Sequence, residues 1–130
     1  MQTKSHYAPI VALLLIAAVS GVALADSIGE KSFELQSIST QLKTNPNDVS
    51  LSLHLADLAI ETGDYQTAIA PMEKLMVLYP DDAQLKLKLG ILYYMVGSYD
   101  LAKSYLEQLI GSPSNPPQLA HQAQTYRARM

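Results

Sequence analysis

The side chains best placed for chemistry are His54, Asp57 and Glu61, at positions i, i+3 and i+7 of one predicted helix. This spacing puts an imidazole and two carboxylates on one helix face, and all three groups are metal ligands. A metal site needs further ligands from another element. The sequence supplies none at a recognisable spacing and contains no His-Glu-x-x-His motif. We therefore interpret this face as solvated, and we predict no metal site.

Two pairs of carboxylates lie at predicted turns. Glu61 and Asp64 flank one turn, and Asp81 and Asp82 precede a helix. Paired carboxylates act as general acid and base only inside a shaped pocket. At helix N-termini they instead stabilise the positive end of the helix dipole. Since the sequence also lacks a serine–histidine–acid arrangement and a glycine-rich phosphate loop, we expect a protein that is not an enzyme and has no cofactor.

The composition excludes several other classes of protein. The chain has 130 residues, is 48% apolar and carries a formal net charge of −3. These values favour a folded domain over disorder, and the absence of a basic patch argues against nucleic-acid binding. The chain has no cysteine, which excludes disulfides, zinc–thiolate sites and cysteine nucleophiles.

Residues 1–25 have the pattern of a cleavable signal peptide. Lys4 precedes an apolar run over 10–25, and Ala23-Leu24-Ala25 offers the small residues that signal peptidase requires. The run is shorter than the about 20 residues of a membrane-spanning helix. We therefore predict cleavage after Ala25 and export to the periplasm. The alternative is that the segment is retained as a membrane anchor.

The chain repeats itself with an offset of 34 residues (97 − 63). The glycines of the repeated pattern can take the left-handed conformation that ends a helix, and its alanines let two helices approach closely. Each copy therefore predicts a tight turn between two antiparallel helices. The residues that recur are Gly63 and Gly97, Tyr65 and Tyr99, Ala68 and Ala102, and Pro46 and Pro80.

This pattern resembles the tetratricopeptide repeat family. The resemblance implies an all-α fold, a short α-solenoid of antiparallel helix hairpins with about two and a half repeats. It divides the chain into a signal peptide (1–25), an N-terminal capping helix that is a degenerate half repeat (26–45), two repeats (46–114) and a C-terminal capping helix (115–130). The helices are expected at about 30–44, 49–62, 65–79, 83–96, 99–110 and 117–129.

Several finer expectations follow for the helices. Leu35, Ile38 and Leu42 share the buried face of the first helix, and Leu101 is expected in the core. Pro71 lies within a helix, so we expect a kink or a helix that starts late. Arrays this short bury little core, so self-association is a further expectation.

The resemblance also implies a binding groove lined by the first helix of each pair. Its centre would be an apolar strip, and its ligand an apolar or amphipathic segment of a protein partner. The alternative is that the chain's own last helix covers the strip. The predicted groove residues are Leu53, Asp57, Ile60, Glu61, Leu87, Ile91, Tyr94, Met95 and His121.

The function that the resemblance implies is a non-catalytic periplasmic adaptor. Residues 85–129 are also similar to the repeat domain that precedes outer-membrane β-barrels in some bacterial export proteins, which suggests a role in outer-membrane assembly or export. Contact with the membrane would then be through a partner. The second hypothesis is an accessory structural subunit of a larger periplasmic or membrane-bound enzyme complex.

Overall fold

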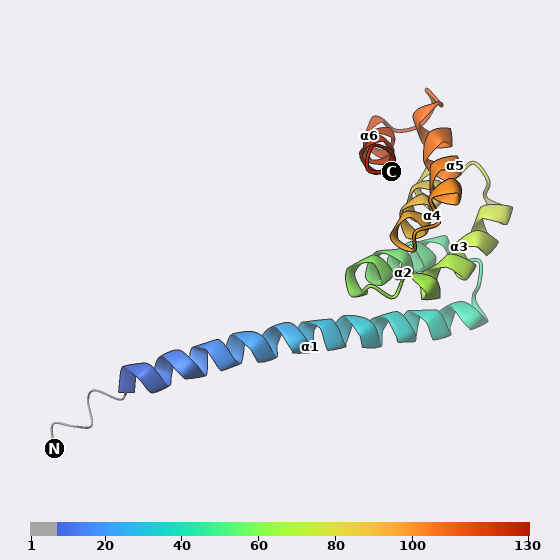
Figure 1. The fold of residues 1–130 in the computed structure, drawn as a ribbon. Helices are drawn as coiled ribbons and strands as arrows, with labels where there is room; N and C mark the ends of the chain where they lie inside the picture. Colours follow the sequence, from blue (N-terminus) through green and yellow to red (C-terminus); the bar gives the residue numbers. More distant parts are fainter. Residues whose placement is uncertain (1–7) are drawn as a thin grey trace, which may run out of the picture.

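The computed structural model describes the backbone of residues 8–130 and the side chains from residue 26 onward. The described residues form helices joined by short turns, without strands (Figure 1). The helices are α1 (Ala8–Thr44), α2 (Val49–Thr62), α3 (Tyr65–Leu78), α4 (Ala83–Met95), α5 (Tyr99–Ile110) and α6 (Pro117–Arg127).

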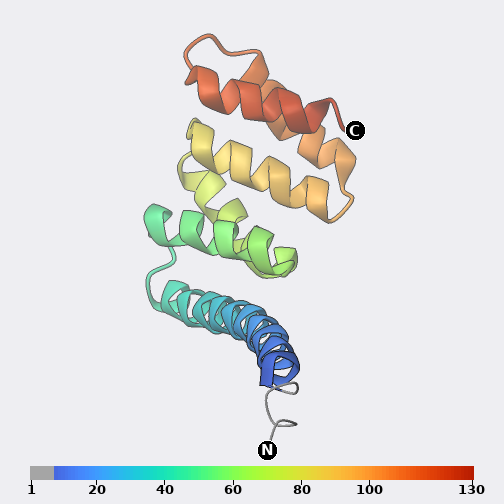
Figure 2. The ribbon, with the colours of Figure 1, turned by 90° about the vertical axis from the view of Figure 1, so that its left-hand side faces the viewer.

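The helices stack in tiers along one direction. Figure 2 shows α1 at one end, then the α2–α3 hairpin, the α4–α5 hairpin and α6. Each hairpin packs internally, and its second helix packs on the first helix of the next tier. This arrangement confirms the predicted all-α fold, a short α-solenoid.

Two glycines make the hairpin turns possible. Gly63 has φ +82° and Gly97 has φ +80°, so both adopt the left-handed conformation expected of them. A residue with a Cβ would be strained there by about 1–2 kcal/mol. Immediately beyond each turn, Ala68 and Ala102 are fully buried and bring the paired helices together. The other pattern residues are less buried: Tyr65 packs partly on the core, whereas Tyr99 and Pro80 are exposed.

Aspartates set where the first helix of each hairpin begins. Asp48 accepts a hydrogen bond from the backbone N–H of Leu51 at 2.9 Å. Asp82 accepts two, from Gln84 at 2.9 Å and Leu85 at 3.0 Å. These bonds satisfy amides that have no partner within the helix, and each cap contributes about 1 kcal/mol.

The C-terminal half of α1 occupies the position of a second hairpin helix. It packs on α2 and more lightly on α3, as α3 does on α4. The predicted face is buried, with Leu35, Ile38 and Leu42 each at most 5% exposed. This packing agrees with the half repeat that the sequence predicts.

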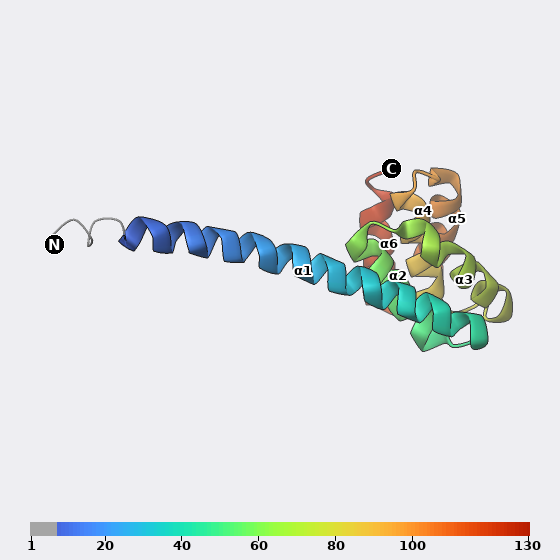
Figure 3. The same ribbon diagram turned by 90° about the horizontal axis from the view of Figure 1, so that it is seen from below.

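The start of α1 differs from the prediction. The helix begins at Ala8 instead of near Glu30, and it passes through Gly29 without a break. Its N-terminal part projects away from the stack (Figures 1 and 3). The alanines and leucines of this part are strong helix formers, and they favour a helix that continues across the glycine. The start of the predicted signal peptide, residues 1–7, lies outside the described residues, and cleavage after Ala25 stays a prediction.

In the part of the chain for which side chains are described, no helix has both the length and the apolar character of a membrane span.

One expectation about the helices fails, and one of two alternatives is excluded. Leu101 is 49% exposed instead of buried. Its equivalents in the other tiers are Thr67 and Phe33 (101 − 34 and 101 − 68). Phe33 is 76% exposed and Thr67 is partly exposed, so this position lies outside the core along the stack. At Pro71, one of the two expected alternatives, a helix that starts late, is excluded, because α3 runs from Tyr65 with Pro71 in its middle. The other alternative, a kink, stays a prediction.

A polar contact joins α3 to α4 beside the core. The Tyr93 hydroxyl donates to a Glu73 carboxylate oxygen, and the Tyr93 ring stacks on Tyr105 with centroids 6.0 Å apart. Burial, and then the hydrogen bond to Glu73, raise the pKa of Tyr93. Burial also raises the pKa of Tyr105, with a smaller contribution from the Glu73 charge. Both phenols therefore stay neutral at ordinary pH.

Candidate functional site

The first helices of the tiers, α2, α4 and α6, lie side by side on one face of the stack (Figure 2). Two adjoining cavities of about 400 Å³ and 290 Å³ lie on this face and share Asp57, Lys88 and Gln122. We call this surface the groove. It is lined by Leu53, His54, Asp57, Leu58, Ile60, Glu61, Gln84, Leu87, Lys88, Ile91, Leu119, Gln122 and Tyr126.

An ion pair crosses the middle of the groove. The Lys88 ammonium from α4 donates to the Asp57 carboxylate from α2. The Lys88 side chain is 27% exposed and that of Asp57 is 48% exposed, so both charges remain accessible to a ligand. Gln122 from α6 lies on the same two cavities. The centre of the groove thus offers a cation, an anion and an amide.

An ion pair and a hydrogen bond connect α1 to the edge of the groove. Lys31 contacts Glu61 at 2.7 Å, and His54 contacts Glu34 at 2.9 Å. All four side chains are about half exposed, so each pair contributes about 0–1 kcal/mol to stability. The three side chains that were first considered as metal ligands thus have other partners. His54 contacts Glu34, Asp57 contacts Lys88, and Glu61 contacts Lys31. Among the described residues no group of three or more candidate ligands converges.

The predicted apolar strip is largely covered. Leu87 is 2% exposed and Ile91 is 4% exposed, and both pack in a cluster with Ala123 of α6. The Tyr94 ring lies edge-on to Tyr126 of α6, with centroids 5.4 Å apart. For these side chains the structure follows the alternative in which the last helix covers the strip. The groove that remains is more polar than expected.

The cavities contain six of the nine predicted groove residues. Tyr94, Met95 and His121 line neither cavity. Tyr94 and Met95 are half-buried beneath the surface, and His121 is exposed outside both cavities. Helix α6 presents Gln122 and Tyr126 to the cavities instead of His121.

Sequence reasoning missed Lys88 as a groove residue, although a signal was present. Lys88 lies three residues before Ile91, the repeat equivalent of Asp57 (57 + 34). Lys88 therefore lies about one helical turn from Ile91, on the same face of α4, and that face lies next to Asp57 of α2. A search for opposite charges offset by one turn between tiers would have found the pair.

Comparison with known families identifies the repeats. The tetratricopeptide repeat family model matches residues 51–82 and 84–113. No curated protein resembles the chain closely enough to count as a match. The two matched segments coincide with the α2–α3 and α4–α5 hairpins and their following turns. Two segments of the chain thus match the tetratricopeptide repeat family, and the helices form the short α-solenoid that such repeats build.

Proposed function

We propose that this protein is a non-catalytic adaptor that binds an amphipathic segment of a protein partner in the groove. Tetratricopeptide repeats indicate a protein–protein interaction module. The observation that carries the finer proposal is the pair of adjoining cavities, which share Asp57, Lys88 and Gln122 and draw their lining from α2, α4 and α6.

The chemistry of the groove favours an amphipathic ligand over a purely apolar one. Leu53 and Ile60 are half-buried and offer apolar contact. Between them and α6 lie the accessible charges of Asp57 and Lys88. A wholly apolar segment would desolvate this ion pair without compensating it, which is costly. A segment with apolar and charged side chains can satisfy both parts of the surface.

The proposed location is the periplasm, after cleavage behind Ala25. The support is the sequence pattern of residues 1–25. Cleavage there would leave Asp26–Thr44 of α1, and with it Leu35, Ile38 and Leu42, which pack against the rest of the stack. The cleaved chain would thus keep these core contacts. A partner in outer-membrane assembly or export is the class that the sequence resemblance suggests.

Blocking the cavities tests the proposal. Gln122 is exposed on α6 and lines both cavities, so Gln122→Trp places a large ring in the groove. Gln124 is exposed two positions further along the same helix and lines neither cavity, so Gln124→Trp is the matched control.

The tagged full-length protein and both variants are used to capture partners from the cells that produce it, with mass spectrometry as the readout. We expect a partner that is retained by the wild type and by Gln124→Trp but lost with Gln122→Trp. The proposal is wrong if no captured protein depends on residue 122. A dependent partner that proves to be a redox or hydrolytic enzyme would favour the accessory-subunit hypothesis over an assembly or export role.

A further inference from the structure

A further pocket lies away from the groove, between α1 and α3. It has a volume of about 360 Å³, at the low end of the about 300–1,000 Å³ of small-ligand sites. Its walls include Leu42 from α1 and Ala70 and Pro71 from α3. None of the residues that line this pocket also lines the groove.

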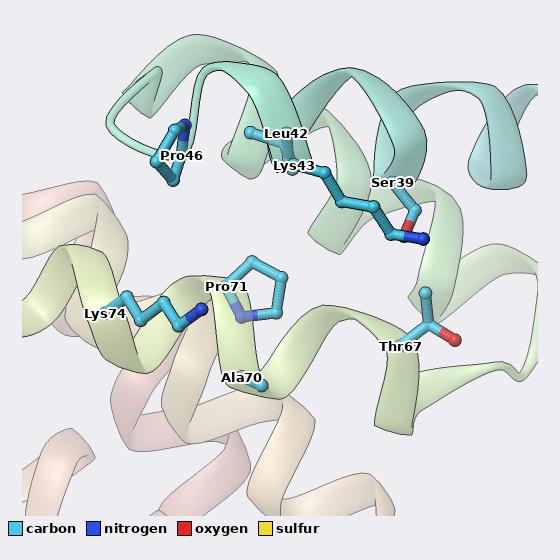
Figure 4. Close-up of a pocket in the computed structure, with 8 residues that line it drawn as sticks. All are labelled: Ser39, Leu42, Lys43, Pro46, Thr67, Ala70, Pro71 and Lys74. Carbon is cyan, nitrogen blue, oxygen red and sulfur yellow. The ribbon is translucent and has the colours of Figure 1, made fainter.

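The pocket is cationic although the protein is acidic overall. Lys43 from α1 and Lys74 from α3 both line it, and no lining residue is a carboxylate. Neither lysine forms an ion pair with another described residue. Figure 4 shows the Lys43 side chain in the gap below α1, with its ammonium near Ser39, and the Lys74 side chain along α3, with its ammonium beside the Pro71 ring. Thr67, which also lines the pocket, donates a hydrogen bond from its hydroxyl to the Asp64 carboxylate at 2.8 Å.

Pro71 adds a hydrogen-bond acceptor. Proline has no N–H, so the carbonyl of Thr67, four residues earlier in α3, lacks its helical donor. The proline ring lies beside that carbonyl in a helix, and both residues line the pocket. A proline inside a helix costs about 3 kcal/mol, and here it leaves a carbonyl without its helical donor in a residue that lines the pocket.

The next tier lacks the same combination. At the equivalent position between α3 and α5, Tyr105 replaces Pro71 (71 + 34), and Val77 replaces Lys43 (43 + 34). The Tyr105 ring is half-buried and stacks on Tyr93, so it fills space that the proline leaves open. The pocket is thus a local departure from the repeat and not a property of every tier.

We infer that this pocket binds an extended segment of a partner protein in which a glutamate or aspartate adjoins an apolar side chain. Lys43 and Lys74 pair with the carboxylate, and the wall of Leu42 and Pro71 receives the apolar group. The Thr67 carbonyl accepts a backbone N–H of the segment. The occupant is assigned by charge complementarity, and a protein segment supplies the carboxylate, the apolar group and the N–H together. This site is independent of the groove proposed above.

The test uses the full-length chain and a fluorescein-labelled peptide, Gly-Ser-Leu-Glu-Leu-Glu-Ser-Gly, followed by fluorescence anisotropy at low ionic strength. A matched peptide carries glutamine in place of both glutamates. The pocket variant is Lys43→Glu with Lys74→Glu. The control is Lys86→Glu with Lys103→Glu, which changes the net charge equally outside the pocket. Circular dichroism confirms that each variant is folded.

We expect the glutamate peptide to bind the wild type, the pocket variant to bind it at least about tenfold more weakly, and the control to stay within about twofold. The glutamine peptide should bind more weakly than the glutamate peptide. Ala70→Trp, which fills the pocket without changing charge, should also weaken binding.

Three results would overturn the inference: no saturable binding of the glutamate peptide, an equal loss in the pocket and control variants, or binding of decanoate where the peptide does not bind. The last result would assign the pocket to a free acyl carboxylate. Gln122→Trp should leave peptide binding unchanged, so failure here and failure of the groove proposal are distinguishable.

Discussion

Gly90 of α4 lies directly against Leu106 of α5. A Cβ added at Gly90 would lie 2.8 Å from Cδ2 and 3.0 Å from Cγ of Leu106. Leu106 is fully buried, so a shift of its side chain disturbs the packed residues around it. We predict that Gly90→Ala destabilises the protein, although alanine is the better helix former. Overpacking costs about 1–3 kcal/mol and the gain in propensity is about 1 kcal/mol, so the net loss is about 1 kcal/mol.

The same substitution should reverse its sign when the clashing atoms are removed. Leu106→Ala deletes both contacting atoms and by itself costs about 2–5 kcal/mol. In that background Gly90→Ala should stabilise the protein by about 1 kcal/mol, because only the propensity gain remains. The coupling free energy between the two sites is then about 2 kcal/mol.

Urea unfolding followed by far-ultraviolet circular dichroism gives the four free energies of this cycle. Trimethylamine N-oxide in all samples supports the weaker variants, so that each has a folded baseline. The reasoning is refuted if Gly90→Ala stabilises the wild type, or if it changes stability by the same amount in both backgrounds. As a matched reverse change, Ala56→Gly at the equivalent position of the first repeat should cost about 1 kcal/mol.

Two further predictions concern polar contacts. Because the pKa of Tyr93 is raised in the folded state, the unfolded chain releases this proton first as the pH rises above about 10. Stability is therefore lost at alkaline pH, and Tyr93→Phe should lose less stability between pH 9 and pH 11 than the wild type in urea titrations. Equal losses would contradict a raised Tyr93 pKa in the folded state. Asp82→Ala removes an acceptor of two backbone amides and should lower the free energy of unfolding by about 1 kcal/mol. Asp81→Ala, one residue earlier, makes no such contact and should change it by less than about 0.5 kcal/mol.

Most of the fold was readable from the sequence because local chemistry and the repeat agree. The left-handed glycines, Gly63 and Gly97, mark the hairpin turns, and the bounds of α2 and α5 match the predicted ranges. The burial of Leu101 was predicted wrongly because its apolar side chain was weighed alone. The polar Thr67 at the same repeat position already indicated that this position lies outside the core.

The candidate site was harder to predict because it depends on how tiers meet. Leu87 and Ile91 are covered because α6 packs against them. No local sequence pattern reports how closely α6 packs on α4. The ion pair between Asp57 and Lys88 likewise joins residues 31 positions apart on different helices. The pocket between α1 and α3 depends on the space beside Pro71, which the sequence marks only as a break in the repeat.

The most direct test of the central claim, that a protein partner occupies the groove, is photocrosslinking in living cells. A benzophenone amino acid is placed at Gln122 in one strain and at Gln124 in another, and the crosslinked products are identified by mass spectrometry. We predict a discrete adduct with a second protein from position 122 and none from position 124. Equal adducts from both positions, or none from position 122, would contradict the claim.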